Sequence, residues 1–186
     1  MLTTWLNTQP NPDYQPDDRS VSAGSLALVG GLFQMKFSTR IDTDLPAERL
    51  FESIGDFETL ERMLIGRGAS VTRIDPSTDP SIGMGWNIRF DWRGKPRHLL
   101  LQLTRFDRPE QMAMVGRSDA LDISINTNVV PLSRARSRLI CETEIKPRNM
   151  RARLMLQTAK LGKGQLDRRY HRRIEEFVGQ MCGTGS

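Results

Sequence analysis

The segment Lys36–Leu64 constrains the fold of this chain most, because it places a strand and two short helices in immediate succession. Phe37 and Ile41 belong to an alternating apolar and polar pattern that predicts a half-buried strand. Pro46 follows, and it suits the first position of a helix, where its missing N–H costs nothing. The helix after it repeats apolar residues on one stripe: Ala47, Leu50, Phe51 and Ile54.

A Gly-Asp pair separates this helix from the next one. Gly55 is predicted to end the first helix in a left-handed cap. Asp56 is predicted to cap a second helix, because its carboxylate can accept hydrogen bonds from the first helical N–H groups. The apolar positions of that helix are Phe57, Leu60 and Leu64.

The hydrophobic period changes to two after Gly68 and stays so up to Ile145. Short alternating runs separated by tight turns predict an antiparallel meander of strands. The runs are Val71–Ile74, Trp86–Trp92, Leu99–Leu103, Met112–Ser118, Leu121–Val129 and Ser137–Ile145.

From Met150 to Met181 the period returns to that of a helix. An unbroken helix over this range would be about 48 Å long, more than one sheet face needs, so we expect a break near Gly162–Gly164. The glycines have two interpretations: they form a flexible gate to a cavity, or they simply start the helix again after an irregular segment.

This order of elements resembles the SRPBCC superfamily, which includes START lipid-transfer domains, birch-pollen allergens, polyketide cyclases and coenzyme Q-binding proteins. The matching features are Pro46-Ala47-Glu48, Leu50-Phe51 with Ile54, Asp56 after the break, and a terminal helix with Tyr170 and Phe177. The chain looks most like a small bacterial member of the polyketide cyclase/dehydrase type. The resemblance implies an α+β helix-grip fold, in which a curved seven-stranded antiparallel sheet grips the long C-terminal helix and leaves an apolar cavity.

The resemblance covers one domain, residues 35–182, between a poorly ordered extension at 1–34 and a frayed tail at 183–186. The extension is rich in Pro, Asn and Asp and shows neither helical nor strand periodicity. Two hypotheses account for it. Either Met35 is the natural start of the protein, or the extension is an arm that packs on a partner.

The cavity is expected to draw on large or adaptable side chains of the sheet and the long helix. Each of these residues also has a plainer interpretation as core packing. Arg117 could meet a polar head group at the pocket mouth. His98 is a candidate for contact inside the cavity, but strand alternation places it on the opposite face if Leu99 and Leu101 point inward. The predicted ligand-binding residues are Trp86, Phe90, Trp92, His98, Met112, Met114, Arg117, Leu166 and Tyr170.

The sequence contains no catalytic signature, so no catalytic residue is predicted. His98, His171, Cys141 and Cys182 are too scattered to form a metal site, and neither a metal nor a cofactor is expected. The leading hypothesis is a non-enzymatic binder or carrier of a hydrophobic or amphipathic molecule, such as a lipid, a quinone or a polyketide. The alternatives are a polyketide cyclase/dehydrase-like enzyme that uses the same cavity, and a protein or membrane interaction module that uses the basic C-terminal helix.

The net charge of +5 comes from one segment, because Met150–Met181 holds eight Lys or Arg residues against three acids. This basic face could be ordinary solvated surface, a surface for anionic membranes, or a nucleic-acid patch. No known nucleic-acid module is visible, so the expected partners are a hydrophobic small molecule and an anionic membrane, without nucleic acid. The absence of a long apolar run and the low cysteine content predict a cytoplasmic protein.

Overall fold

The structure of the chain is a computed structural model that describes residues 34–74, 79–92 and 94–183. The predicted N-terminal extension lies outside these residues except for Gln34, and the predicted frayed tail lies outside them except for Gly183. The described elements, in chain order, are β1 (Met35–Thr43), α2 (Ala47–Ile54), α3 (Phe57–Gly66), β2 (Ser70–Arg73), β3 (Gly85–Trp92), β4 (Lys95–Asp107), β5 (Gln111–Arg117), β6 (Leu121–Pro131), β7 (Ser137–Pro147), α4 (Met150–Lys160) and α5 (Lys163–Gly183).

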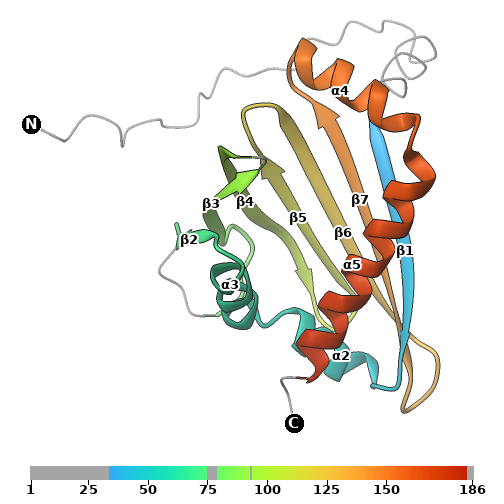
Figure 1. Cartoon of the computed structure of the whole chain (residues 1–186). Helices are drawn as coiled ribbons and strands as arrows, with labels where there is room; N and C mark the ends of the chain where they lie inside the picture. Colours follow the sequence, from blue (N-terminus) through green and yellow to red (C-terminus); the bar gives the residue numbers. More distant parts are fainter. Residues whose placement is uncertain (1–33, 75–78, 93, 184–186) are drawn as a thin grey trace, which may run out of the picture. The chain divides into compact units, whose positions relative to one another are not determined.

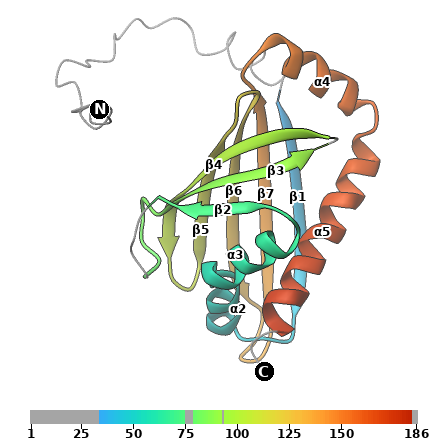
Figure 2. The ribbon, with the colours of Figure 1, turned by 60° about the vertical axis from the view of Figure 1, so that its left-hand side comes forward.

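The seven strands form one sheet with the order β1-β7-β6-β5-β4-β3-β2, and every neighbouring pair is antiparallel. The first strand therefore lies beside the last one, while β2 to β7 follow the chain as a meander (Figure 1). The sheet is strongly curved, and α5 lies along its concave side (Figure 2). This arrangement confirms the predicted helix-grip fold.

The two short helices form where their sequences predict them, but the break between them differs from expectation. Asp56 caps α3, since its carboxylate accepts hydrogen bonds from the Thr59 N–H at 3.0 Å and the Thr59 hydroxyl at 2.7 Å. The left-handed cap predicted at Gly55 is wrong, because its φ is −88°. A Cβ at Gly55 would lie 3.1 Å from the Phe51 carbonyl oxygen and 3.2 Å from the Phe106 ring, so a side chain there would crowd both neighbours.

The C-terminal helix is interrupted, as predicted, although the break begins one residue before Gly162. The first part, α4, ends at Lys160, and α5 starts at Lys163. Asn149 caps α4 by accepting a 2.8 Å hydrogen bond from the Ala152 N–H. The two parts run in different directions, with α5 contacting β1 and α2 (Figure 1).

Two apolar clusters stabilise the domain. The larger one joins α2 and α3 to the concave face of the sheet, and Leu50, Phe51 and Leu103 are almost completely buried in it. The smaller one lies at the other end, where Leu156 of α4 packs over Met35 and Phe37 of β1. Between them, the middle of the concave face is covered by α5 and α3 and is not filled completely.

Candidate ligand-binding cavity

A cavity of about 310 Å³ lies between the concave face of the sheet and the helices. We call it the inner cavity. Its floor comes from strands β3 to β7, and its roof comes from α2, α3 and α5. The lining residues are Ile54, Leu60, Leu64, Ile88, Leu99, Leu101, Met112, Met114, Gly116, Ile123, Ile125, Thr127, Leu139, Cys141, Ile174 and Phe177.

Strand alternation explains why this lining is apolar. Successive strand residues point to opposite faces, so Met112, Met114 and Gly116 of β5 share the concave face. Gly116 contributes no side chain at that level, although its neighbours on β4 and β6 are Leu101 and Ile123. The missing side chain leaves room at this point of the floor.

The polar side chains of the inner cavity are Thr127 and Cys141, which face each other across β6 and β7. The Thr127 hydroxyl lies 3.9 Å from the Cys141 Sγ, and the Tyr170 hydroxyl lies 3.2 Å from the same sulfur. The Tyr170 oxygen is also 2.9 Å from the Thr143 hydroxyl. These groups form a hydrogen-bonded chain from the cavity floor to the underside of α5.

Burial keeps the titratable groups of this hydrogen-bonded network, Cys141 and Tyr170, protonated. It raises the pKa of the Cys141 thiol above its ordinary value, and the hydrogen bonds from Tyr170 and Thr127 only partly oppose this effect. The pKa of Tyr170 is raised as well, first by burial and then by the neighbouring Cys141. At neutral pH the inner cavity therefore presents a neutral Cys141 thiol beside the Thr127 hydroxyl, and Cys141 is a poor nucleophile.

A second cavity of about 350 Å³ adjoins the inner one toward α4. We call it the outer cavity. The two share Leu99 and Ile123 as lining residues. The outer cavity also has polar and charged lining residues from β4 and the β5–β6 turn. Its full lining is Phe90, Arg97, His98, Leu99, Ser118, Asp119, Ala120, Leu121, Ile123 and Met155.

The residues predicted to bind ligand are distributed over several environments. Met112 and Met114 line the inner cavity, and Phe90 lines the outer one. His98 borders the outer cavity but is exposed, with its Nε2 atom 3.0 Å from the Asn87 Oδ1 atom. The side chain of Trp92 lies outside the part of the chain that the structure describes.

Trp86 faces inward yet lies under α3. Its ring packs against Phe57 at 5.0 Å between centroids, and its Nε1–H donates a 2.6 Å hydrogen bond to Glu61. Leu166 and Tyr170 belong to the smaller apolar cluster, where the Tyr170 ring stacks on Phe37 at 5.2 Å. These three residues support the cavity walls without lining either cavity.

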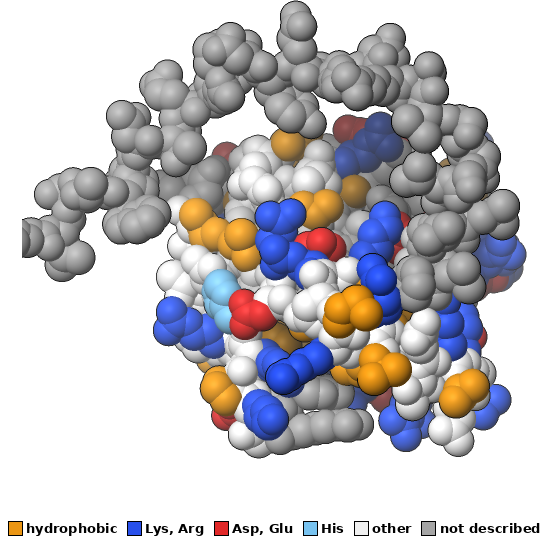
Figure 3. All heavy atoms as spheres, turned by 90° about the horizontal axis from the view of Figure 1, so that it is seen from above, with side chains coloured by type: hydrophobic (Ala, Val, Ile, Leu, Met, Phe, Trp, Pro, Cys, Tyr) orange, Lys and Arg blue, Asp and Glu red, His pale blue; other side chains and the backbone are white. Residues whose placement is uncertain are grey.

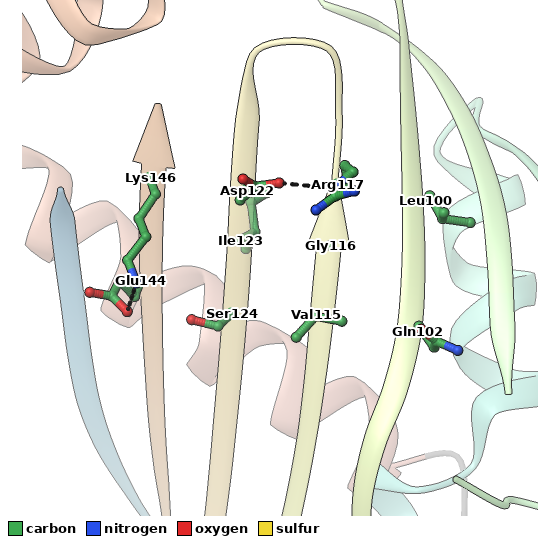
Figure 4. A pocket seen from close by; sticks show the side chains of 10 residues that line it. All are labelled: Leu100, Gln102, Val115, Gly116, Arg117, Asp122, Ile123, Ser124, Glu144 and Lys146. Carbon is green, nitrogen blue, oxygen red and sulfur yellow. Dashed lines mark hydrogen bonds and ion pairs between the residues drawn. The ribbon is translucent and has the colours of Figure 1, made fainter. Parts of the chain in front are cut away.

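Arg117 lies on the convex face of the sheet, opposite the helices. It lines a hollow of about 460 Å³, the convex hollow, which Figure 4 shows from the outside. The Arg117 Nε is 3.2 Å from Asp122, and the Lys146 Nζ is 3.3 Å from Glu144. The charges in this hollow are thus paired at the surface, where such pairs contribute little energy.

Sequence reasoning placed Leu60, Leu64, Ile174 and Phe177 on apolar helix faces but did not assign them to the cavity. Their helical spacing indicated burial, and the tertiary arrangement decides that they face an opening.

In the described residues, no three or more His, Cys, Asp or Glu side chains are grouped so that they could hold a metal ion. Within the same residues, no helix combines the length and apolar character that a membrane span requires.

Comparison with known proteins identifies the fold. No protein-family model matches the chain, and no curated protein sequence matches it. Among solved structures, the protein TTHA0849 from Thermus thermophilus superimposes with a TM-score of 0.61 at 12% identity, covering 82% of this chain and 100% of that one.

Two further solved structures with a similar fold belong to proteins whose names are those of enzymes. Norcoclaurine synthase from Thalictrum flavum, in complex with dopamine and hydroxybenzaldehyde, has a TM-score of 0.60 at 10% identity and covers 86% of this chain and 93% of that one. The ZhuI aromatase/cyclase from Streptomyces sp. R1128 has a TM-score of 0.57 at 12% identity, with coverage of 80% and 93%. The chain thus shares the helix-grip fold of these solved structures, and it has an apolar cavity under its terminal helix.

Proposed function

We propose that this protein binds and carries a hydrophobic or amphipathic small molecule, whose apolar body occupies the inner cavity. The observation that carries the proposal is the cavity itself, about 310 Å³ in volume and lined by apolar side chains apart from Thr127 and Cys141. Such dimensions are at the lower end of those of small-molecule sites, which are mostly apolar with few polar groups. The helix-grip neighbours support the proposal at the level of the fold.

The lining selects against charge at the buried end of the ligand. Among the residues that the structure describes, none that lines the inner cavity has a charged side chain. An ion without a partner in such a site would lose its hydration and gain no compensating contact. Thr127 can instead serve a single hydroxyl or carbonyl group of the ligand.

The outer cavity suits the polar end of an elongated ligand. It adjoins the inner cavity at Leu99 and Ile123 and adds Arg97, His98 and Asp119. An amphipathic molecule could place its apolar body beneath α5 and its head group between these side chains. Lipids, quinones and polyketides share this division into an apolar body and a polar end.

Native mass spectrometry of the full chain after gentle purification tests the proposal. We expect a bound organic molecule that organic solvent releases, and a rise in melting temperature when lipids, quinones or polyketides are added back. An empty protein whose melting temperature none of these classes changes would overturn the proposal.

A polyketide cyclase- or dehydrase-like reaction is a second candidate. The observation that favours it is the hydrogen-bonded chain from Tyr170 through Cys141 to Thr127, whose Cys141 and Thr127 end lines the inner cavity and can hold a substrate carbonyl in place. A carrier releases its ligand unchanged, whereas an enzyme converts it. Product analysis of the released molecule, with Tyr170→Phe as the comparison, separates the two functions.

A carrier of poorly water-soluble molecules needs a place to exchange them. We propose an anionic membrane surface as that second partner, and the cytoplasm as the compartment, since Cys141 and Cys182 are both free thiols.

A further inference from the structure

Helix α4 has two apolar faces, and only one of them is used by the fold. Ala152 and Leu156 face the domain and are buried. On the other side, Met150 is 71% exposed, Leu154 is 66% exposed, and Leu161, directly after the helix, is 90% exposed. We call these last three residues the apolar stripe.

The three stripe residues share one side of the helix with Gln157 and are flanked by positive charge. At 3.6 residues per turn, Met150, Leu154 and Leu161 lie within about 40° of one another around the helix axis. Arg151 follows on one side of the stripe, and Arg153 and Lys160 lie on the other. The segment Met150–Lys160 contains no acidic residue. Figure 3 looks onto the end of the molecule that carries α4, where hydrophobic and basic side chains are interspersed.

The position of α4 connects the stripe to the outer cavity. The Arg148 N–H donates a 2.8 Å hydrogen bond to the Ala120 carbonyl, and the Arg148 guanidinium donates a 2.6 Å bond to the Ser118 carbonyl. These contacts fix the start of α4 to the β5–β6 turn, whose residues line the outer cavity together with Met155. The stripe therefore lies beside the cavity wall and faces away from it.

We propose that α4 docks on an anionic lipid surface, with the apolar stripe inserted between acyl chains and the flanking basic residues directed to the phosphate head groups. Apolar side chains bordered by Lys and Arg are the pattern of helices that lie in a membrane interface. A stripe of three residues is also narrow for a stable protein partner, which needs a larger apolar area. The inference that docking serves ligand exchange through the outer cavity rests on the proposed carrier function, whereas the docking itself is argued from the exposed residues of α4.

Flotation of the full chain with lipid vesicles tests the docking. We expect binding to phosphatidylcholine vesicles that contain phosphatidylglycerol, little binding to pure phosphatidylcholine, and weaker binding as the salt concentration rises. Arg151→Glu with Arg153→Glu should lower the partition coefficient by at least about 25-fold, since each lost basic residue accounts for roughly fivefold. Leu154→Glu should lower it to the level of pure phosphatidylcholine.

Matched controls separate α4 from the rest of the surface. Leu132→Glu changes an exposed leucine of the β6–β7 turn, and Arg168→Glu with Arg172→Glu reverses two exposed charges on α5. Both should bind vesicles within about threefold of the unchanged chain, because a Debye length near 10 Å limits the reach of charges outside the contact. Circular dichroism checks that each variant is folded.

The proposal is overturned if the chain does not bind anionic vesicles at low salt, or if Leu154→Glu binds them as the unchanged chain does. It is also overturned if the stripe proves to join two copies of the chain, seen as a dimer that Leu154→Glu dissociates. Binding of the uncharged dye N-phenyl-1-naphthylamine without vesicles reports separately on the cavity. Stripe-dependent vesicle binding without dye binding would refute the carrier function and leave the docking intact.

Discussion

Gly116→Leu is the substitution that tests the inner cavity most sharply. A Cβ built at Gly116 would lie 3.1 Å from the Leu99 Cδ1 atom, 3.5 Å from the Ile123 Cβ and 3.6 Å from the Leu101 Cδ1. The closest of these is the flexible end of a leucine, which can move by a few tenths of an ångström. The four added carbon groups would occupy about 120 Å³ if each takes about 30 Å³, the share of one water molecule in the liquid. That is nearly two fifths of the 310 Å³ cavity.

The substitution is expected to leave the domain folded and to weaken binding strongly. Replacing a strand glycine regains about 0.5–1 kcal/mol of backbone entropy, and each of the four added carbon groups contributes about 0.8 kcal/mol when buried. Overpacking costs roughly 1–3 kcal/mol, so the free energy of unfolding should rise by about 1–3 kcal/mol. A ligand that fills the cavity must then leave it or shift, and we expect at least tenfold weaker binding, or about 1.4 kcal/mol.

Fluorescence titration with N-phenyl-1-naphthylamine measures the binding, and urea unfolding measures the stability. The matched control is Val115→Leu, which enlarges the neighbouring side chain on the convex face, where Val115 lines the convex hollow. The control should bind the dye normally. If Gly116→Leu stays folded and binds the dye as tightly as the unchanged chain, the dye does not occupy the inner cavity and the reasoning fails.

Three further predictions concern stability and reactivity. Asp56→Ala should lower the free energy of unfolding by about 1 kcal/mol by removing the α3 cap, with Asp56→Asn close to unchanged in urea unfolding. Burial opposes ionisation of Asp56, but the hydrogen bonds from Thr59 hold its pKa below the ordinary value of 3.8. The contribution of the cap to stability is therefore complete above about pH 4 and is lost as the pH falls further. An acid titration in which Asp56→Ala and the unchanged chain lose stability in parallel would contradict this. Burial raises the pKa of the Cys141 thiol above its ordinary value of 9.0. The contribution of the protonated thiol to the free energy of unfolding is therefore complete below about pH 9 and declines as the pH rises. Cys141→Ala should lose less stability at alkaline pH than the unchanged chain does. An aromatic disulfide reagent should label half-buried Cys182 faster than buried Cys141, so Cys182→Ser should abolish the faster labelling phase. Equal labelling rates for the two thiols would contradict this, because they would mean that the cover over Cys141 opens as readily as the end of α5.

The sequence patterns predicted the elements because each reports a local property. Alternation along β5 and β6 assigned Met114 and Ile125 to the covered face, and the structure places both in the cavity lining. The break of the terminal helix followed from length and from Gly162. The left-handed cap predicted at Gly55 was wrong, and the Phe106 ring that crowds this position comes from far away in the sequence, which local rules do not include.

Side-chain direction alone could not distinguish cavity from core. Trp86 points to the concave face as its parity indicates, but the curvature of the sheet brings it under α3, where Phe57 and Glu61 engage it. Arg117 lies on the opposite face from the cavity, at the position that strand alternation gives it. The roof residues Leu64 and Phe177 needed the arrangement of α3 and α5 around the sheet, which depends on the curvature and is not written in any one segment.

The central claim is that ligand binds between the sheet and α5. A crystal structure of the full chain with N-phenyl-1-naphthylamine at equal molarity tests it most directly. We predict electron density for the dye in contact with Met114, Ile125 and Phe177, with the Arg117–Asp122 pair undisturbed. Density in the convex hollow, with the inner cavity collapsed or filled by side chains, would contradict it.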